Sequence, residues 1–172
     1  MLIVISGLPG VGKTTVADLV GARLGAVRLS IDPVEDALLG AGFPQGWETG
    51  VAAYEAVRAM AELNLRTGRT VVVDAVNDSE PARDTWRRAA DSADAELCSV
   101  VLTMSDAIGH ASRLRERDRG FTHVTEPTWT EVAGREVAPW VDTLRTIDVS
   151  GMSGEQVAAD VERYVVEFRF NN

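Results

Sequence analysis

The sequence predicts an α/β fold in which helices lie on both faces of one parallel, five-stranded sheet. Five short apolar segments alternate along the chain with longer segments whose apolar residues recur at helical spacing, and this alternation is typical of a parallel sheet. The apolar segments are continuous, which indicates strands that are buried on both faces. With 172 residues and no internal repeat or linker, the chain is expected to form one domain over residues 1–172.

The elements of this fold can be placed by their apolar patterns and by the residues that begin and end helices. The expected strands cover residues 2–6, 27–30, 70–74, 96–103 and 143–149. The expected helices cover residues 13–24, 33–40, 47–67, 79–93 and 106–117, followed by one amphipathic helix through Trp129, Val132, Ala133, Val137 and Trp140 and a C-terminal helix through Val157, Val161, Val165 and Phe168. Pro33 suits the first turn of its helix, with Asp32 as a candidate N-cap, and Gly68 suits the end of the long third helix.

Composition and charge exclude several classes of protein. The formal net charge is −9 and the isoelectric point is near 4.7, which disfavours broad electrostatic binding of nucleic acid. No apolar run approaches the roughly 20 residues that cross a membrane, and the first strand begins too early to leave room for a signal peptide. The single cysteine, Cys98, lies in an apolar run and is expected to be a buried core thiol. The sequence therefore predicts a cytoplasmic protein.

A glycine-rich turn joins the first strand to the first helix. Residues 7–14 fit the pattern G-x-x-x-x-G-K-[ST], with Gly7, Leu8, Pro9, Gly10, Val11, Gly12, Lys13 and Thr14 in order. Glycines bring backbone N–H groups close to phosphate oxygens, and the helix N-terminus adds partial positive charge. Lys13 is the only lysine among the 17 basic residues; it can reach the β- and γ-phosphates of a nucleotide, where a planar arginine fork would not fit. Thr14 is expected to bind Mg²⁺ through its hydroxyl and Thr15 to contact a phosphate, so the turn predicts nucleotide binding.

Two aspartates follow strands that are expected to flank the first strand. Asp32 comes after the second strand and Asp74 ends the third, and ligands of open α/β sheets lie beyond these carboxyl ends. We interpret Asp32 as the general base that accepts the hydroxyl proton of a phosphoryl acceptor, and Asp74 as a residue that binds Mg²⁺ or holds the acceptor. Two plainer roles are also compatible with the sequence, namely Asp32 as a helix N-cap and Asp74 as a strand-end turn residue.

Four arginines lie close together in the sequence, at Arg113, Arg115, Arg117 and Arg119. Arginines that close over a phosphoryl-transfer site stabilise its negative charge, and a mobile flap that carries them excludes water. We expect Arg117 and Arg119 to be catalytic and Arg113 to lie against the adenine ring, while a solvated helix end is the plainer interpretation of the segment. Outside this segment, one arginine is a weaker candidate and the two histidines are expected to be polar surface or cap residues: Arg135, His110 and His123.

With these residues placed, the sequence resembles the small P-loop kinases. More narrowly, it resembles the kinase branch of P-loop ATPases that is related to chloramphenicol phosphotransferase, the polynucleotide 5′-kinases and the shikimate, gluconate and nucleoside-monophosphate kinases. The segments SIDPVEDAL and VVVDAVNDSEPARDTWRRAA are similar to those that carry the two aspartates in these relatives, and RLRERDRG is similar to the arginine-bearing lid. The resemblance implies a P-loop NTPase three-layer sandwich with strand order 2-3-1-4-5, a lid over about residues 113–128, and ATP with Mg²⁺ as the phosphoryl donor. No N-K-x-D motif and no motor-type Walker B aspartate is present, which disfavours a GTPase switch and a motor ATPase.

The phosphoryl acceptor is expected to bind over about residues 33–67. The candidate contacts are Asp32, Phe43, Trp47, Tyr54, Arg58 and Asp74. An anionic acceptor such as a nucleotide would need an arginine anchor, and Arg58 is the only arginine between residues 33 and 60. An uncharged, hydroxylated small molecule, such as an antibiotic or another natural product, therefore fits better. The alternatives are a polynucleotide 5′-hydroxyl kinase or nucleotide kinase, and a regulatory module that binds ATP without transferring phosphate.

Overall fold

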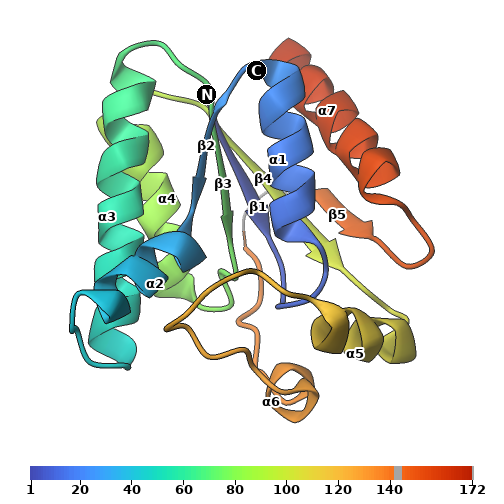
Figure 1. Cartoon of the computed structure of the whole chain (residues 1–172). Coiled ribbons are helices and arrows are strands. Elements are labelled where there is room, and N and C mark those ends of the chain that lie inside the picture. The colour runs from blue at the N-terminus through green and yellow to red at the C-terminus, as the bar shows by residue number, and fades with distance from the viewer. Residues whose placement is uncertain (142–144, 172) are drawn as a thin grey trace.

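The computed structural model describes residues 1–141 and 145–171, and its centre is one parallel sheet. The strands are β1 (Leu2–Ser6), β2 (Val27–Ser30), β3 (Val71–Ala75), β4 (Leu97–Thr103) and β5 (Arg145–Asp148). They lie side by side in the order β2-β3-β1-β4-β5, which confirms the predicted fold class and strand order (Figure 1). The carboxyl ends of β1, β2 and β3 therefore meet at one edge of the sheet, where the glycine-rich turn follows β1, Asp32 follows β2 and Asp74 lies near the end of β3.

Helices cover both faces of this sheet. In Figure 1, α1 (Lys13–Leu24) and α7 (Gly154–Asn171) lie on one side, and α3 (Trp47–Arg66) and α4 (Glu80–Ser92) lie on the other. The short helix α2 (Ile31–Gly40) packs against α3, while α5 (Ala107–Glu116) and α6 (Trp129–Ala133) lie beyond the carboxyl edge of the strands. In the part of the chain that the structure describes, no helix is long and apolar enough to cross a membrane.

The alternation of side chains along the strands builds one core on each face. Ile3 and Ile5 of β1 pack in the cluster beneath α1 and α7, whereas Leu2 and Val4 pack with α3 and α4. Because both faces are covered, every residue of β1 and β3 is buried, which explains the continuous apolar runs of the sequence. Cys98 of β4 is fully buried, as predicted, and burial raises the pKa of its thiol to about 12.

The structure shortens the helix that the sequence predicts up to Trp140. Helix α6 ends at Ala133, and residues 134–141 form no helix. The guanidinium group of Arg83 donates hydrogen bonds to the carbonyl oxygens of Pro139 (2.7 Å) and Ala138 (2.6 Å) and lies 3.7 Å from the centroid of the Trp140 ring. The apolar spacing that suggested a helix therefore belongs to a segment that Arg83 binds in a different conformation.

The other predicted elements agree with the structure to within two residues, apart from the last strand. Its predicted start, Thr143, lies outside the described residues, and β5 is described from Arg145.

The two plainer roles that the sequence allowed for Asp32 and Asp74, a helix N-cap and a turn residue, are both wrong. Ser30 is the N-cap of α2 and Asp32 lies in the first turn, and Asp74 is a buried residue inside β3 rather than part of a turn.

Candidate active site

The glycine-rich turn, residues 7–14, passes from β1 to α1 in a shape that favours glycine. Gly10 and Gly12 have φ angles of 91° and 94°, in the left-handed region that costs other residues energy. At Gly7, a Cβ atom would overlap the carbonyl oxygen of Leu102 on β4. Glycine thus allows this turn to lie directly against the end of the sheet, with α1 starting at Lys13.

Lys13 is almost fully buried at the start of α1. Its Nζ atom donates a hydrogen bond to the carbonyl oxygen of Leu8 at 3.1 Å. Burial lowers the pKa of Lys13 to about 8, because the charged ammonium loses its hydration. Four nearby charges modify this pKa, which two carboxylates raise and two guanidinium groups lower: Asp32, Asp74, Arg117 and Arg119. The predicted catalytic residues are therefore close enough to interact with one another electrostatically.

Asp74 contacts both the glycine-rich turn and strand β2. The hydroxyl of Thr14 donates to Oδ2 of Asp74 at 2.9 Å, and Oδ1 lies 3.0 Å from Nη2 of Arg28. A hydroxyl oxygen and a buried carboxylate in contact are hard ligands of the kind that Mg²⁺ prefers when nucleotide phosphates and waters complete its shell. Thr14 and Asp74 therefore fit a magnesium ion, and the prediction that they bind one stays a prediction. Arg28 is a neighbour of Asp74 that no sequence motif indicated.

Asp32, Lys13, Arg117 and Arg119 line one cavity of about 200 Å³ above the turn. Nη1 of Arg119 forms an ion pair with Asp32, and Nε of Arg119 donates a hydrogen bond to the Glu126 carboxylate at 2.6 Å. Arg117 forms an ion pair with the same Glu126 carboxylate, and burial, together with the charge of Arg119, lowers the pKa of Arg117. Three cations thus face a space beside the nucleotide-binding turn, an arrangement that can bind a phosphoryl group.

The segment that carries these arginines, residues 113–128, is held against α2. Oδ1 of Asp36 accepts hydrogen bonds from the backbone N–H groups of Val124 (2.9 Å), His123 (2.7 Å) and Thr122 (3.1 Å), and these bonds lower the pKa of Asp36. The ring of His123 packs so close to Gly40 that a Cβ atom there would lie 2.9 Å from it. The arginine segment is thereby fixed over the helix that carries Asp32.

Arg113 and Thr15, the other two predicted nucleotide contacts, lie near the loop between β5 and α7. Nη2 of Arg113 donates to the carbonyl oxygen of Met152 at 3.4 Å. A Cβ atom on Gly154, the first residue of α7, would lie 3.1 Å from the methyl group of Thr15. Neither residue lines the small cavity that Lys13 and the two lid arginines share.

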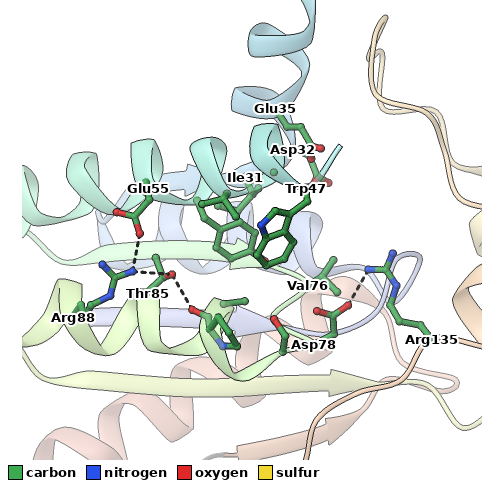
Figure 2. A pocket seen from close by; sticks show the side chains of 16 residues that line it. Ile31, Asp32, Glu35, Trp47, Glu55, Val76, Asp78, Thr85, Arg88 and Arg135 are labelled. Carbon is green, nitrogen blue, oxygen red and sulfur yellow. Dashed lines mark hydrogen bonds and ion pairs between the residues drawn. The ribbon is translucent and has the colours of Figure 1, made fainter. Parts of the chain in front are cut away.

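A larger cavity of about 500 Å³ adjoins the first one beneath α2 and between α3 and α4 (Figure 2). Four residues line both cavities: Asp32, Glu35, Val76 and Arg135. Two predicted acceptor contacts, Trp47 and Tyr54, form part of its wall. Tyr54 is buried, which raises the pKa of its hydroxyl, and the hydroxyl oxygen accepts a hydrogen bond from the backbone N–H of Asn77 at 3.3 Å. Asp32 thus stands at the junction of the two cavities.

Three of the predicted acceptor contacts do not line the larger cavity. Nε of Arg58 lies 2.8 Å from the carboxylate of Glu55 on its own helix, Phe43 is half exposed in the loop before α3, and Asp74 lies beside Thr14. Among the described residues, two other arginines line this cavity: Arg88 and Arg135. Helical spacing places Arg58 one turn beyond Tyr54, but the acidic residues of α3 bind it along the helix surface.

His110 is a buried neighbour of the nucleotide-binding turn, and its prediction as a polar surface or cap residue is wrong. Nε2 of His110 is hydrogen-bonded to the carbonyl oxygen of Pro9 at 2.7 Å, which requires a proton on that nitrogen. A Cβ atom on Gly10 would lie 3.1 Å from its ring, and the ring of Trp129 meets it edge to face with centroids 5.1 Å apart. Leu114, four residues later on α5, is also buried. The spacing of these two residues on one helix face was the sequence signal that could have indicated the burial of His110.

Comparison with known proteins assigns the chain to a family. The family described as AAA domain matches residues 2–136, most of the chain. The chain belongs to this family. No curated protein sequence matches this AAA domain.

Solved structures with the same fold as this AAA domain include several small kinases. A gluconokinase from Sinorhizobium meliloti superposes with a TM-score of 0.71 at 18% identity, over 98% of this chain and 93% of that one. The APS kinase CysC of Mycobacterium tuberculosis, in complex with AMPPNP and APS, gives 0.67 at 20% identity over 95% and 96% of the two chains. The tunicamycin resistance protein of Deinococcus radiodurans gives 0.64 at 20% identity over 95% and 94%. The AAA domain therefore has a P-loop kinase-like fold.

Proposed function

We propose that this protein is a kinase that transfers the γ-phosphoryl group of ATP to a hydroxyl group of a small molecule. The observation that carries the proposal is the position of Asp32. Its carboxylate lines both the small cavity that Lys13, Arg117 and Arg119 share and the larger cavity beside it. One carboxylate between a phosphate-binding space and an acceptor-sized space is the arrangement that phosphoryl transfer to a hydroxyl requires.

On the donor side, the glycine-rich turn and the N-terminus of α1 bind the phosphates of ATP through backbone N–H groups. Lys13 binds the β- and γ-phosphates, and Arg113 lies against the adenine. Thr14 and Asp74 hold Mg²⁺, which neutralises phosphate charge when it is bound. Because these contacts are preformed around buried charges, the donor site favours a polyphosphate over an uncharged ligand.

In the transfer step, the Asp32 carboxylate accepts the proton of the acceptor hydroxyl. The hydroxyl oxygen forms a bond to the γ-phosphorus while the bond from that phosphorus to the β–γ bridging oxygen breaks, and ADP leaves with the bonding electrons. Arg117 and Arg119 stabilise the negative charge on the transferring group. The ion pair between Arg119 and Asp32 must open before the transfer step. The γ-phosphate then binds Arg119, and the Asp32 carboxylate is free to accept the proton.

The acceptor binds in the cavity that Trp47 and Tyr54 help to line. Its size suits a small molecule, and the fold is shared with proteins described as a gluconokinase, an APS kinase and a tunicamycin resistance protein. An antibiotic or another hydroxylated natural product is a suitable acceptor class. A net charge of −9 argues against a polynucleotide acceptor, and a kinase that consumes ATP fits a cytoplasmic location.

The test combines an acceptor screen with one substitution. Purified protein is incubated with ATP, Mg²⁺ and pools of hydroxylated metabolites and antibiotics, and ADP release and phosphorylated products are measured. With a productive acceptor, Asp32→Asn should lower kcat by about 10²–10⁴-fold while the Kd for ATP changes by less than about threefold. Asp91→Asn, an exposed change of the same kind on α4, should have no effect. ATP binding without turnover, unchanged by Asp32→Asn, would instead indicate a regulatory module.

A further inference from the structure

The charges around the larger cavity indicate more about the acceptor than its size does. Four carboxylates and two guanidinium groups line it: Asp32, Glu35, Glu55, Asp78, Arg88 and Arg135. The cavity therefore has more negative than positive charge, and a low-dielectric wall strengthens the field of these charges inside it. The inference below rests on the proposed function, because it concerns the acceptor of the proposed transfer.

Most of these charged groups already have a partner in the protein. Nη2 of Arg88 lies 2.6 Å from the carboxylate of Glu55, and Nη1 of Arg135 lies 3.1 Å from that of Asp78; both pairs are drawn in Figure 2. Asp32 pairs with Arg119 of the lid. The arginines are thus neutralised, and the cavity does not offer a free guanidinium group to an anionic acceptor.

Glu35 is the exception among the carboxylates of the cavity. Within the described residues, no arginine, lysine or histidine lies within ion-pair distance of Glu35, and its side chain is partly buried. Partial burial and the neighbouring charge of Asp32 raise the pKa of Glu35, and the charge of Arg119 offsets only part of this rise, so the protein stabilises the charged carboxylate incompletely. A carboxylate in such a place gains most from a cation that arrives with a ligand.

The position of Glu35 connects it with the reacting group. Glu35 follows Asp32 by three residues on α2, so both side chains lie on one face of the helix, and Figure 2 shows their carboxylates next to each other above Trp47. The indole of Trp47 is 71% exposed, so its ring face is available to a ligand. An aromatic face next to a free carboxylate binds alkylammonium groups through cation–π attraction and charge together.

We propose that the acceptor is a hydroxylated compound that carries a protonated amine, and that Glu35 is the residue that recognises the amine. The hydroxyl lies at Asp32 and the ammonium group at Glu35 and Trp47, so the two groups of the ligand are separated by about 5–6 Å, the distance between side chains one helical turn apart. The apolar part of the acceptor packs against Tyr54 and the rest of the cavity wall. This revises the uncharged acceptor that the apolar sequence of residues 33–60 suggested.

The experiment uses matched forms of hydroxylated amines as acceptors. A panel of aromatic and aliphatic amino alcohols is prepared as the free amine, as the N,N-dimethyl amine and as the N-acetyl amide. The dimethyl form keeps the positive charge with added bulk, whereas the acetyl form removes the charge. ATP-dependent phosphorylation is measured for the wild type, for Glu35→Gln and for Glu48→Gln, an exposed glutamate in the first turn of α3 that does not line the cavity.

Wild type and Glu48→Gln should phosphorylate both charged forms with a kcat/KM at least about tenfold above that of the N-acetyl form, a difference of about 1.4 kcal/mol. In Glu35→Gln this preference should fall below about threefold, while the rate with the N-acetyl form does not fall. Equal use of all three forms by the wild type, or a preference that survives in Glu35→Gln, would overturn the inference and leave the kinase proposal intact.

A binding measurement distinguishes a failure of the transfer reaction from a failure of the amine site. If no compound of the panel is phosphorylated, the affinities of the same compounds are measured by calorimetry with AMPPNP and Mg²⁺ present. Amine binding that Glu35→Gln weakens at least about tenfold supports the amine site even though no compound of the panel accepts the phosphoryl group. If neither the wild type nor Glu48→Gln binds any amine of the panel, the amine site is refuted as well.

Discussion

The buried ammonium of Lys13 predicts an unusual dependence of stability on pH. In the folded protein its pKa is about 8, against an ordinary value of 10.5 that applies to the unfolded chain. Between these two values the unfolded state holds more protons, so the free energy of unfolding rises as the pH rises. Burial of the charged form costs about 3 kcal/mol at pH 7.5 and about 1 kcal/mol at pH 9.5, so the folded state gains about 2 kcal/mol over this interval.

The measurement compares wild type with Lys13→Met by urea denaturation at pH 7.5 and 9.5 without nucleotide. Because Lys13 is the only lysine, no other lysine contributes, and the buried thiol of Cys98, whose raised pKa acts in the opposite direction, is the same in both proteins. The stability of the wild type should improve relative to Lys13→Met by about 2 kcal/mol from the lower to the higher pH. A difference between the two proteins that is independent of pH would refute a lowered pKa at this site.

Three further outcomes are expected at the donor site. Nucleotide affinity should fall by up to about tenfold per pH unit above pH 8 in a binding titration, since phosphates bind the protonated form of Lys13, and no such slope should remain in Lys13→Met. Asp74→Asn should raise the Mg²⁺ concentration for half-maximal activity at least about tenfold, whereas Asp18→Asn, which alters another carboxylate beside Arg28, should not. His110→Ala should raise the KM for ATP about tenfold with little change in kcat, and His110→Gln, which keeps a donor, should restore part of it.

The parts of this protein that could be predicted from the sequence depend on local pattern and on one rule of parallel sheets. Continuous apolar runs mark β1 and β3 because both faces of these strands are covered. The motif from Gly7 to Thr14 demands its backbone shape by itself, so its place between β1 and α1 could be predicted without knowledge of any tertiary contact. Asp32 and Asp74 could be placed beside it because parallel strands end at a common edge.

The parts that could not be predicted depend on contacts between distant segments. Arg83 binds the chain near Trp140, and nothing in the sequence around residue 140 reveals an arginine 57 residues earlier that replaces the expected helical hydrogen bonds. His110 is buried because Trp129 and the glycine-rich turn close around it, whereas its own sequence neighbours are mixed. Arg58 does not line the larger cavity, whereas Arg135 does. The reason is the same for both, because each arginine lies where it forms an ion pair, Arg58 with Glu55 on its own helix and Arg135 with Asp78 at the cavity.

The charges of the site also explain why its parts come from separate elements. Three cations meet at the site, namely Lys13 at the start of α1 and Arg117 and Arg119 of the lid. They would repel one another if no carboxylate lay between them. Asp32 from α2 and Glu126 from the end of the lid provide the opposite charge through ion pairs with the two arginines. Under the proposed function, we expect a bound triphosphate to provide this negative charge to the same three cations and so to release Asp32 from Arg119. The ion pair between Arg119 of the lid and Asp32 of α2 therefore joins the two segments, and we expect it to open when the charge of a bound phosphate replaces that of Asp32.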